Sequence, residues 1–142
     1  MPLIAIVDDN DGILDTLQIY LQAKSDYEIR TYDDPQKLLD QMHAGLRPDF
    51  VVTDFYMFGM NGVELLDTIA ILHPDAYGII MTGYPEGIAS VSRLSRRYPI
   101  LCKGSTKFFR DLIQELQSAL VSIEEKNKKQ LEFKTNPGLI SL

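Results

Sequence analysis

The sequence has little cysteine, few histidines and no tryptophan. A lone cysteine, Cys102, excludes an internal disulfide and fits a reducing compartment. It also excludes a cysteine-cluster zinc site, and the two histidines, His43 and His73, lie too far apart in the chain to favour a histidine-based metal site. The usual thiolate and imidazole metal sites therefore do not explain this protein.

Positive charge and long apolar runs are scarce as well. The 142 residues carry 14 Lys and Arg against 20 Asp and Glu, a net charge of −6, which argues against binding to nucleic acid or to an anionic membrane. No stretch approaches the roughly 20 apolar residues of a membrane-spanning helix. The apolar start, residues 3–7, is too short and runs into acidic residues too early for a signal peptide. We expect a cytoplasmic protein.

The remaining composition is that of an ordinary globular domain, with 45% hydrophobic and 24% charged residues. A chain of this length buries enough surface to fold without a disulfide or a structural metal. We expect one domain over residues 1–122. Residues 123–142 are polar and are expected to form a helical extension, a linker or a flexible tail.

Short apolar runs alternate with helical patterns five times along the chain. Such alternation predicts βαβ crossovers and hence a parallel sheet with helices on both faces. The expected strands are 3–7, 27–32, 50–53, 77–81 and 100–102. The expected helices lie around 13–21, 35–42, 63–72 and 86–97, and a last helix begins near Ser105 or Thr106.

Residues that carry chemistry follow four of these strands. In a parallel sheet the carboxyl ends of the strands meet at one edge, where ligands bind. Three carboxylates meeting there repel one another, and a hard cation such as Mg²⁺ relieves the repulsion while leaving room for a phosphorylated ligand. The residues are Asp8 and Asp9, then Asp54, then Thr82, then Lys103.

Four motifs give the sequence a family resemblance. They are Ile6-Val7-Asp8-Asp9-Asn10, the run from Val52 to Gly62 around Asp54, Met81-Thr82-Gly83, and Lys103. Together, over about residues 3–120, they resemble the receiver domain of two-component response regulators. The resemblance implies a flavodoxin-like, doubly wound (βα)5 fold with a five-stranded parallel sheet in the order 2-1-3-4-5.

The resemblance also implies a function. Asp54 would accept a phosphoryl group from a sensor histidine kinase or a histidine phosphotransfer protein, and Thr82 and Lys103 would bind the phosphoryl oxygens. Asp8, Asp9 and Asp54 would hold Mg²⁺ together with the backbone carbonyl of Tyr56. Phosphorylation would change the surface seen by an output domain beyond this chain, by a partner or by a second copy. Such a domain assists its own phosphorylation and dephosphorylation but is not classed as an enzyme.

Three positions depart from the family pattern. Phe58 stands where the family usually has proline, and Ile100 stands where it commonly has a switching aromatic residue. Gly104 replaces the proline after Lys103, and because a cis bond before a non-proline residue costs about 2.5–4 kcal/mol, we expect a trans bond there. None of these changes removes a reacting group, so they bear on the output and not on phosphorylation.

Two alternatives stay open at this point. The run Asp9-Asn10-Asp11-Gly12 resembles the nucleophile motif of haloacid-dehalogenase-type phosphatases, with Asp9 as the nucleophile, but this interpretation leaves Asp54 unexplained. The second alternative is a receiver-like interaction module that is never phosphorylated.

Overall fold

The computed structural model describes residues 1–87 and 97–135. Within them, a five-stranded parallel sheet has the order β2-β1-β3-β4-β5, which confirms the expected topology. The strands are β1 (Leu3–Val7), β2 (Glu28–Tyr32), β3 (Phe50–Asp54), β4 (Tyr77–Thr82) and β5 (Ile100–Cys102).

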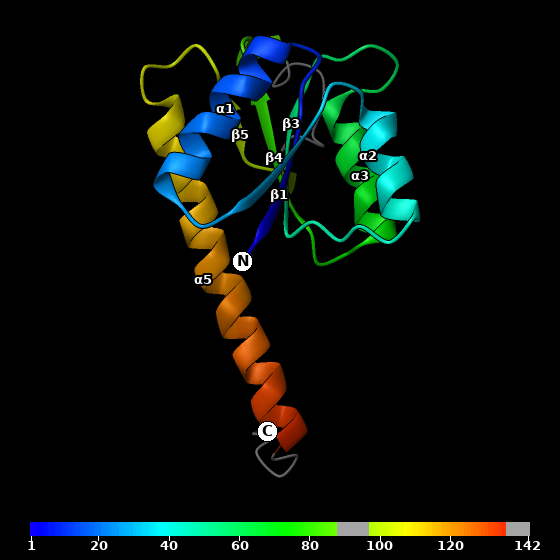
Figure 1. Ribbon diagram of the computed structural model, residues 1–142, viewed down its shortest axis with the longest axis vertical. Helices are drawn as coiled ribbons and strands as arrows, with labels where there is room; N and C mark the ends of the chain where they lie inside the picture. Colours follow the sequence, from blue (N-terminus) through cyan, green and yellow to red (C-terminus); the bar gives the residue numbers. More distant parts are fainter. Residues whose placement is uncertain (88–96, 136–142) are drawn as a thin grey trace. The chain divides into compact units, whose positions relative to one another are not determined.

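Helices cover both faces of the sheet. Figure 1 shows α1 on one side and α2 and α3 next to each other on the other side. The helices are α1 (Asp11–Lys24), α2 (Pro35–His43), α3 (Gly62–Leu72) and α5 (Phe108–Thr135). The helix expected over residues 86–97 falls almost entirely outside the described residues.

Side chains at the helix starts explain where α2 and α3 begin. Asp34 accepts a hydrogen bond from the Gln36 amide, and Pro35 occupies the first helical position, as the sequence predicts. Asn61 and Glu64 form a reciprocal capping box at the start of α3. These caps fix the first residue of each helix.

The last helix begins later than the sequence predicted. It starts at Phe108, because Ser105 lies in a turn that precedes it. In this turn the Ser105 hydroxyl accepts from the Lys107 amide, and the Ser105 carbonyl accepts from the Phe108 amide. A turn-forming serine therefore delays the helix beyond Thr106.

The sheet is buried on both faces. All five residues of β3 are buried, which is why its sequence reads as a continuous apolar run and not as an alternating one. Helix α1 buries Leu14, Leu17 and Leu21. The cluster on the side of α2 and α3 includes Val7, Leu38, Leu39, Val51, Leu65, Leu66, Ile69 and Ile80.

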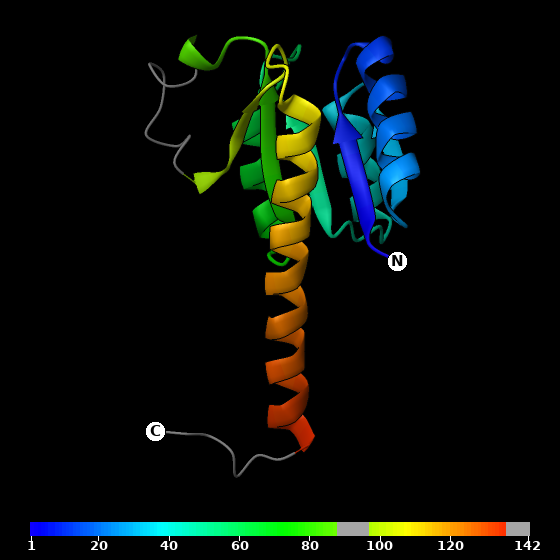
Figure 2. The same ribbon diagram turned by 90° about the vertical axis from the view of Figure 1, so that its left-hand side faces the viewer.

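The chain divides into two compact units, Met1–Phe109 and Arg110–Leu142. The sheet and its carboxyl edge belong to the first unit. The described part of the second unit is the remainder of α5, drawn as one continuous helix in Figure 2. No helix among residues 1–87 and 97–135 combines the length and the apolar character needed to cross a membrane.

Candidate functional site

The carboxyl ends of the strands bring the predicted residues to one edge. Asp54 is the last residue of β3 and is paired in register with Met81 of β4, one residue before Thr82. Lys103 directly follows β5, and its amide donates to the Thr82 carbonyl over 2.8 Å. Asp8 directly follows β1. The strand order thus places β3 between the strands that carry the other groups.

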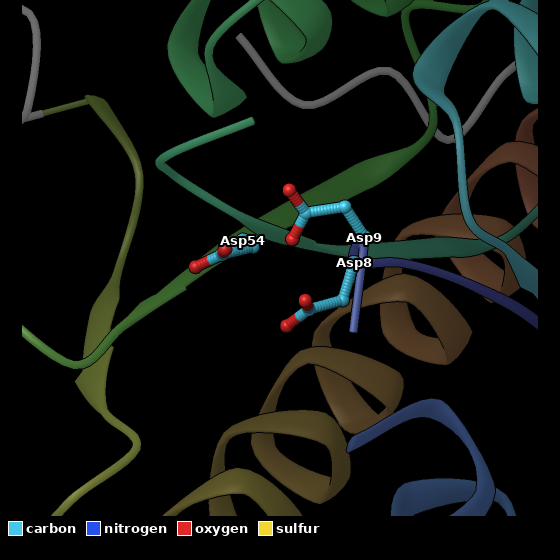
Figure 3. Close-up of side chains that lie close together, drawn as sticks. All are labelled: Asp8, Asp9 and Asp54. Carbon is cyan, nitrogen blue, oxygen red and sulfur yellow. The ribbon is translucent and has the colours of Figure 1, made fainter. Parts of the chain in front are cut away.

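Three carboxylates cluster at this edge. One carboxylate oxygen from each of Asp8, Asp9 and Asp54 lies within 4.8 Å of the other two (Figure 3). Asp8 is completely buried and Asp54 is only 6% exposed, whereas Asp9 is exposed to solvent. The cluster therefore has a buried floor and one open side.

One backbone amide and one side-chain ammonium fix the orientation of the buried carboxylate of Asp8. Its Oδ1 accepts a hydrogen bond from the Asn10 amide over 2.9 Å, and its Oδ2 lies 3.0 Å from Lys103 Nζ. The Asn10 side chain in turn caps α1 by accepting from the Ile13 amide. The helix start and the carboxylate are thus positioned by the same short turn.

Lys103 joins two of the three carboxylates. Its Nζ lies 3.0 Å from Asp8 Oδ2 and 3.1 Å from Asp54 Oδ1. Burial alone would lower the pKa of Lys103, but the hydrogen bond to Asp8 and the charge of Asp54 outweigh it and raise the pKa. The lysine is therefore a permanent cation at the carboxylate that the family resemblance assigns as the phosphoacceptor.

The surroundings of Asp54 disfavour its ionised form. Burial and then the charge of Asp8 raise its pKa, and Lys103 opposes both effects without cancelling them. A further cation at this edge would stabilise the ionised form of Asp54.

The donor set fits a hard divalent cation. Carboxylate oxygens are the ligands that Mg²⁺ prefers, and it usually takes one or two of them and fills its remaining positions with water and phosphate oxygens. The three aspartates provide such oxygens within one ion's reach, and the exposed side at Asp9 leaves access for waters. The three clustered carboxylates fit the aspartates of the predicted ligand set.

Thr82 is the buried hydroxyl of the site. It is fully buried at the end of β4, and its Oγ1 accepts a hydrogen bond from the Tyr84 amide over 3.0 Å. A hydroxyl can donate while it accepts, so this bond fixes the oxygen and leaves its proton for another partner. The role of Tyr84 in positioning Thr82 was not predicted from the sequence.

The loop after Asp54 turns back at once into α3. Its Phe55 amide donates to the Met81 carbonyl over 3.0 Å, and Gly59 has φ +87°. A Cβ atom at Gly62 would lie 2.6 Å from the Asp54 carbonyl oxygen, so only glycine fits there. Tyr56, whose carbonyl is a predicted metal ligand, lies in this loop two residues after Asp54.

The positions that depart from the family pattern leave this edge intact. Every peptide bond among residues 1–87 and 97–135 is trans, including the bond before Gly104, as predicted. Phe58 is 97% exposed at the loop tip, and Ile100 pairs in register with Ile80. Tyr98, two residues earlier, donates from its hydroxyl to Asp67 Oδ1 of α3 over 2.7 Å.

Fold and site together define a doubly wound α/β protein whose strand ends carry a cluster of acidic groups and one lysine. The chain belongs to the response regulator receiver domain family, which it matches over residues 4–96, and it is a receiver domain of two-component signalling. The match favours the receiver interpretation over the phosphatase and the unphosphorylated module.

Individual relatives are consistent with this assignment. An Arabidopsis thaliana protein, ARR21, named as a two-component response regulator, is 38% identical over 63 residues. The match covers 44% of this chain and only 10% of that protein, so the chain spans about a tenth of the length of the curated relative.

Two solved receiver structures are matched over almost their whole length. A CheY-like response regulator receiver domain of Methanospirillum hungatei is 26% identical, with a TM-score of 0.75, over 89% of this chain and 98% of that one. The response regulator TrrA of Thermotoga maritima, solved in complex with Mg²⁺ and BeF, is 27% identical, with a TM-score of 0.71, over 84% of this chain and 99% of that one.

Proposed function

We propose that Asp54 is the phosphoacceptor and that its phosphorylation requires Mg²⁺ held by Asp8, Asp9, Asp54 and the backbone carbonyl of Tyr56. The observation that carries the proposal is the position of Asp54. It is a buried carboxylate at a strand end, 3.1 Å from Lys103 Nζ and clustered with two further carboxylates. Bound there, the metal would neutralise charge on the transferring phosphoryl oxygens.

The donor is a phosphohistidine of a sensor histidine kinase or of a histidine phosphotransfer protein. A carboxylate oxygen of Asp54 attacks phosphorus, the P–N bond to the imidazole breaks, and its electron pair stays on the imidazole nitrogen, which takes up a proton. Asp54 needs no general base because the carboxylate is already ionised at neutral pH.

Lys103 and Thr82 act on the phosphoryl oxygens. The ammonium of Lys103 is already held against Asp54, so it faces the place where negative charge accumulates during transfer. The Thr82 hydroxyl is fixed by the Tyr84 amide and supplies a hydrogen-bond donor. The 3.1 Å contact between Lys103 and Asp54 supports this role for the lysine.

The phosphorylated domain would present a changed surface to an output domain beyond this chain, to a partner protein or to a second copy. We place it in the cytoplasm, and we propose residues 1–122 as the receiver domain and residues 123–142 as a helical extension, a linker or a flexible tail. In this role it is a phosphoprotein switch that assists its own phosphorylation and dephosphorylation and is not classed as an enzyme.

The test uses acetyl phosphate and intact mass. With Mg²⁺, the wild-type chain should gain one phosphoryl group and Asp54→Asn none. Asp15→Asn, an exposed aspartate of α1, is the matched control and should be labelled like the wild type. Label that persists in Asp54→Asn would refute the assignment, and an unlabelled wild type would support an interaction module. Label on Asp9, with turnover of a generic phosphomonoester, would support the phosphatase.

A further inference from the structure

Strand β3 carries a buried hydroxyl directly before the proposed phosphoacceptor. Thr53 is completely buried, and its Oγ1 donates a hydrogen bond to the Asp54 carbonyl oxygen over 2.9 Å. The same Oγ1 lies 3.8 Å from Sδ of Met57. Because a hydroxyl has a single proton, the shorter contact is the hydrogen bond and the sulfur is a packing neighbour. Valine has the same shape and would bury no polar group in this strand, so the hydroxyl calls for a role.

Packing at the start of α3 fixes the orientation of the Thr53 side chain. A Cβ atom at Gly62 would lie 3.2 Å from Cγ2 of Thr53 and 2.6 Å from the Asp54 carbonyl oxygen. The methyl group of Thr53 and this carbonyl therefore occupy the space that a side chain at residue 62 would need. A β-branched side chain held in this way has little freedom about χ1. The hydroxyl is thus directed at Asp54 by packing as well as by its hydrogen bond.

The hydrogen bond from Thr53 completes the contacts of the peptide unit between Asp54 and Phe55. On one side of this unit, the Phe55 amide donates to the Met81 carbonyl of β4 over 3.0 Å. On the other side, the Asp54 carbonyl accepts from the Thr53 hydroxyl. A trans peptide is planar and its N–H and C=O point in opposite directions, so bonds at both groups fix the orientation of the plane. The next unit is held as well, because the Phe55 carbonyl accepts from the Gly62 amide over 2.9 Å.

This peptide unit connects the two groups on which the proposed function depends. Its orientation sets ψ of Asp54 and φ of Phe55. It therefore constrains both the direction of the Asp54 carboxylate and the path of the chain to the Tyr56 carbonyl. Metal binding and group transfer require such groups to be held within about 0.5 Å of the productive geometry.

We propose that Thr53 is a positioning residue for phosphoryl transfer. Its hydroxyl holds the peptide unit after Asp54 and thereby places the Asp54 carboxylate and the Tyr56 carbonyl for Mg²⁺ and for the phosphoryl donor. Thr53 acts through these two residues and not on the phosphoryl group itself. The proposal rests on the phosphorylation of Asp54 argued above.

The experiment separates the hydroxyl of Thr53 from its methyl group. Thr53→Val keeps the shape and removes the donor, so it should take label from acetyl phosphate about tenfold more slowly than the wild type at saturating Mg²⁺. Thr53→Ser keeps the donor and loses a buried methyl group, so it should unfold at lower urea concentration but be labelled at the wild-type rate. Thr68→Val is the matched control, because it removes a similar hydrogen bond, to the Glu64 carbonyl, at an exposed position of α3.

Mg²⁺ binding gives a second measurement that needs no phosphoryl donor. The Kd is fitted from the rise of the melting temperature with Mg²⁺ concentration. Thr53→Val should bind Mg²⁺ with a Kd about fivefold higher than the wild type, the effect of one ordinary hydrogen bond. Thr53→Ser and Thr68→Val should keep the wild-type Kd. A hydroxyl with a merely structural role would change the urea midpoint and leave this Kd unchanged.

An unchanged labelling rate or an unchanged Kd in Thr53→Val would overturn the proposal, and so would labelling rates that follow the urea midpoints of the variants. If circular dichroism shows that Thr53→Val does not fold, Thr53→Ala takes its place, because Thr53→Ala and Thr53→Ser differ only in the hydroxyl. Failure of the proposed function looks different, because the wild type then takes no label on Asp54 at all.

Discussion

The ammonium of Lys103, which follows β5, lies 3.1 Å from the carboxylate of Asp54, the last residue of β3. The same ammonium contacts the completely buried carboxylate of Asp8. With Asp9 included, the edge carries three carboxylates and one lysine, so without a divalent cation it has a formal charge of −2, from −3 + 1. This charge imbalance leads to three predictions, and the tight packing at Gly62 leads to a fourth.

Removing Lys103 should destabilise the protein strongly when no divalent cation is present. Lys103→Ala leaves Asp8 and Asp54 buried without their common partner, a change that typically costs about 3–5 kcal/mol. Urea unfolding in EDTA at pH 7 measures the loss. Lys37→Ala is the control, because Lys37 also pairs with an aspartate, Asp33, but both side chains are exposed. Similar urea midpoints for the two variants would show that the contacts of Lys103 contribute little to the stability of the fold.

Mg²⁺ should stabilise the wild-type chain and should hardly affect Asp9→Asn, which lacks one of the clustered carboxylates. Binding to the folded state alone adds about 2.7 kcal/mol when free metal reaches 100 times its Kd. The melting temperatures of both proteins are measured in a Mg²⁺ titration. Asp15→Asn is the control for the loss of one acidic charge outside the cluster. A wild-type shift that Asp9→Asn reproduces in full would place the metal outside this cluster.

Asp54→Asn should be more stable than the wild type at pH 7 in EDTA. The pKa of Asp54 is raised in the folded state, mainly by burial, so the folded protein binds this proton more tightly than the unfolded chain does. The wild type therefore loses stability as pH rises from the unfolded pKa, about 3.9, through the raised folded pKa. The gain in stability from Asp54→Asn should be largest at neutral pH and should shrink as the buffer becomes more acidic.

Melting curves across this pH range measure the difference between Asp54→Asn and the wild type. Adding Mg²⁺ at pH 7 should reduce this difference in melting temperature, because the metal favours the ionised carboxylate of the wild type. A wild type that is more stable than Asp54→Asn at neutral pH in EDTA would show that the Lys103 contact outweighs burial at this position.

Gly62→Ala should destabilise the protein by about 2 kcal/mol or more, since overpacking against a fixed group typically costs 1–3 kcal/mol. The added methyl group would lie 2.6 Å from the backbone oxygen of Asp54 and 3.1 Å from Cα of Phe55, neither of which can rotate away. Chemical denaturation measures this cost, with Gly104→Ala as the control, because the nearest atom to the added methyl group would be Cys102 Sγ at 4.0 Å, an ordinary contact distance. Because the clash moves the Asp54 backbone, acetyl phosphate labelling should also slow. Unchanged stability and labelling would mean that the loop relaxes freely.

The architecture was largely predictable from the sequence because the signals are local. A continuous apolar run such as Phe50–Thr53 indicates a strand buried on both faces, and Asp34 before Pro35 marks a helix start whatever lies around it. The predicted start of the last helix was too early. Serine is common both in turns and at helix N-caps, and only the packing of the surrounding chain decides that Ser105 forms a turn here.

The sequence by itself determined which residues meet at the edge, because parallel strands all present their carboxyl ends on the same side. Asp8, Asp54, Thr82 and Lys103 each stand at or directly after a strand end, so the strand pattern alone brings them together. The strand pattern does not determine the contacts among these residues. Only the tertiary structure decided three features of the site. Lys103 contacts both Asp8 and Asp54, and Asp54 is buried while Asp9 is exposed. The missing side chain of Gly87 leaves room for Tyr56 and Tyr84. These features depend on distances between residues far apart in the chain, which are fixed by how helices and loops pack on the sheet and not by any local pattern of residues.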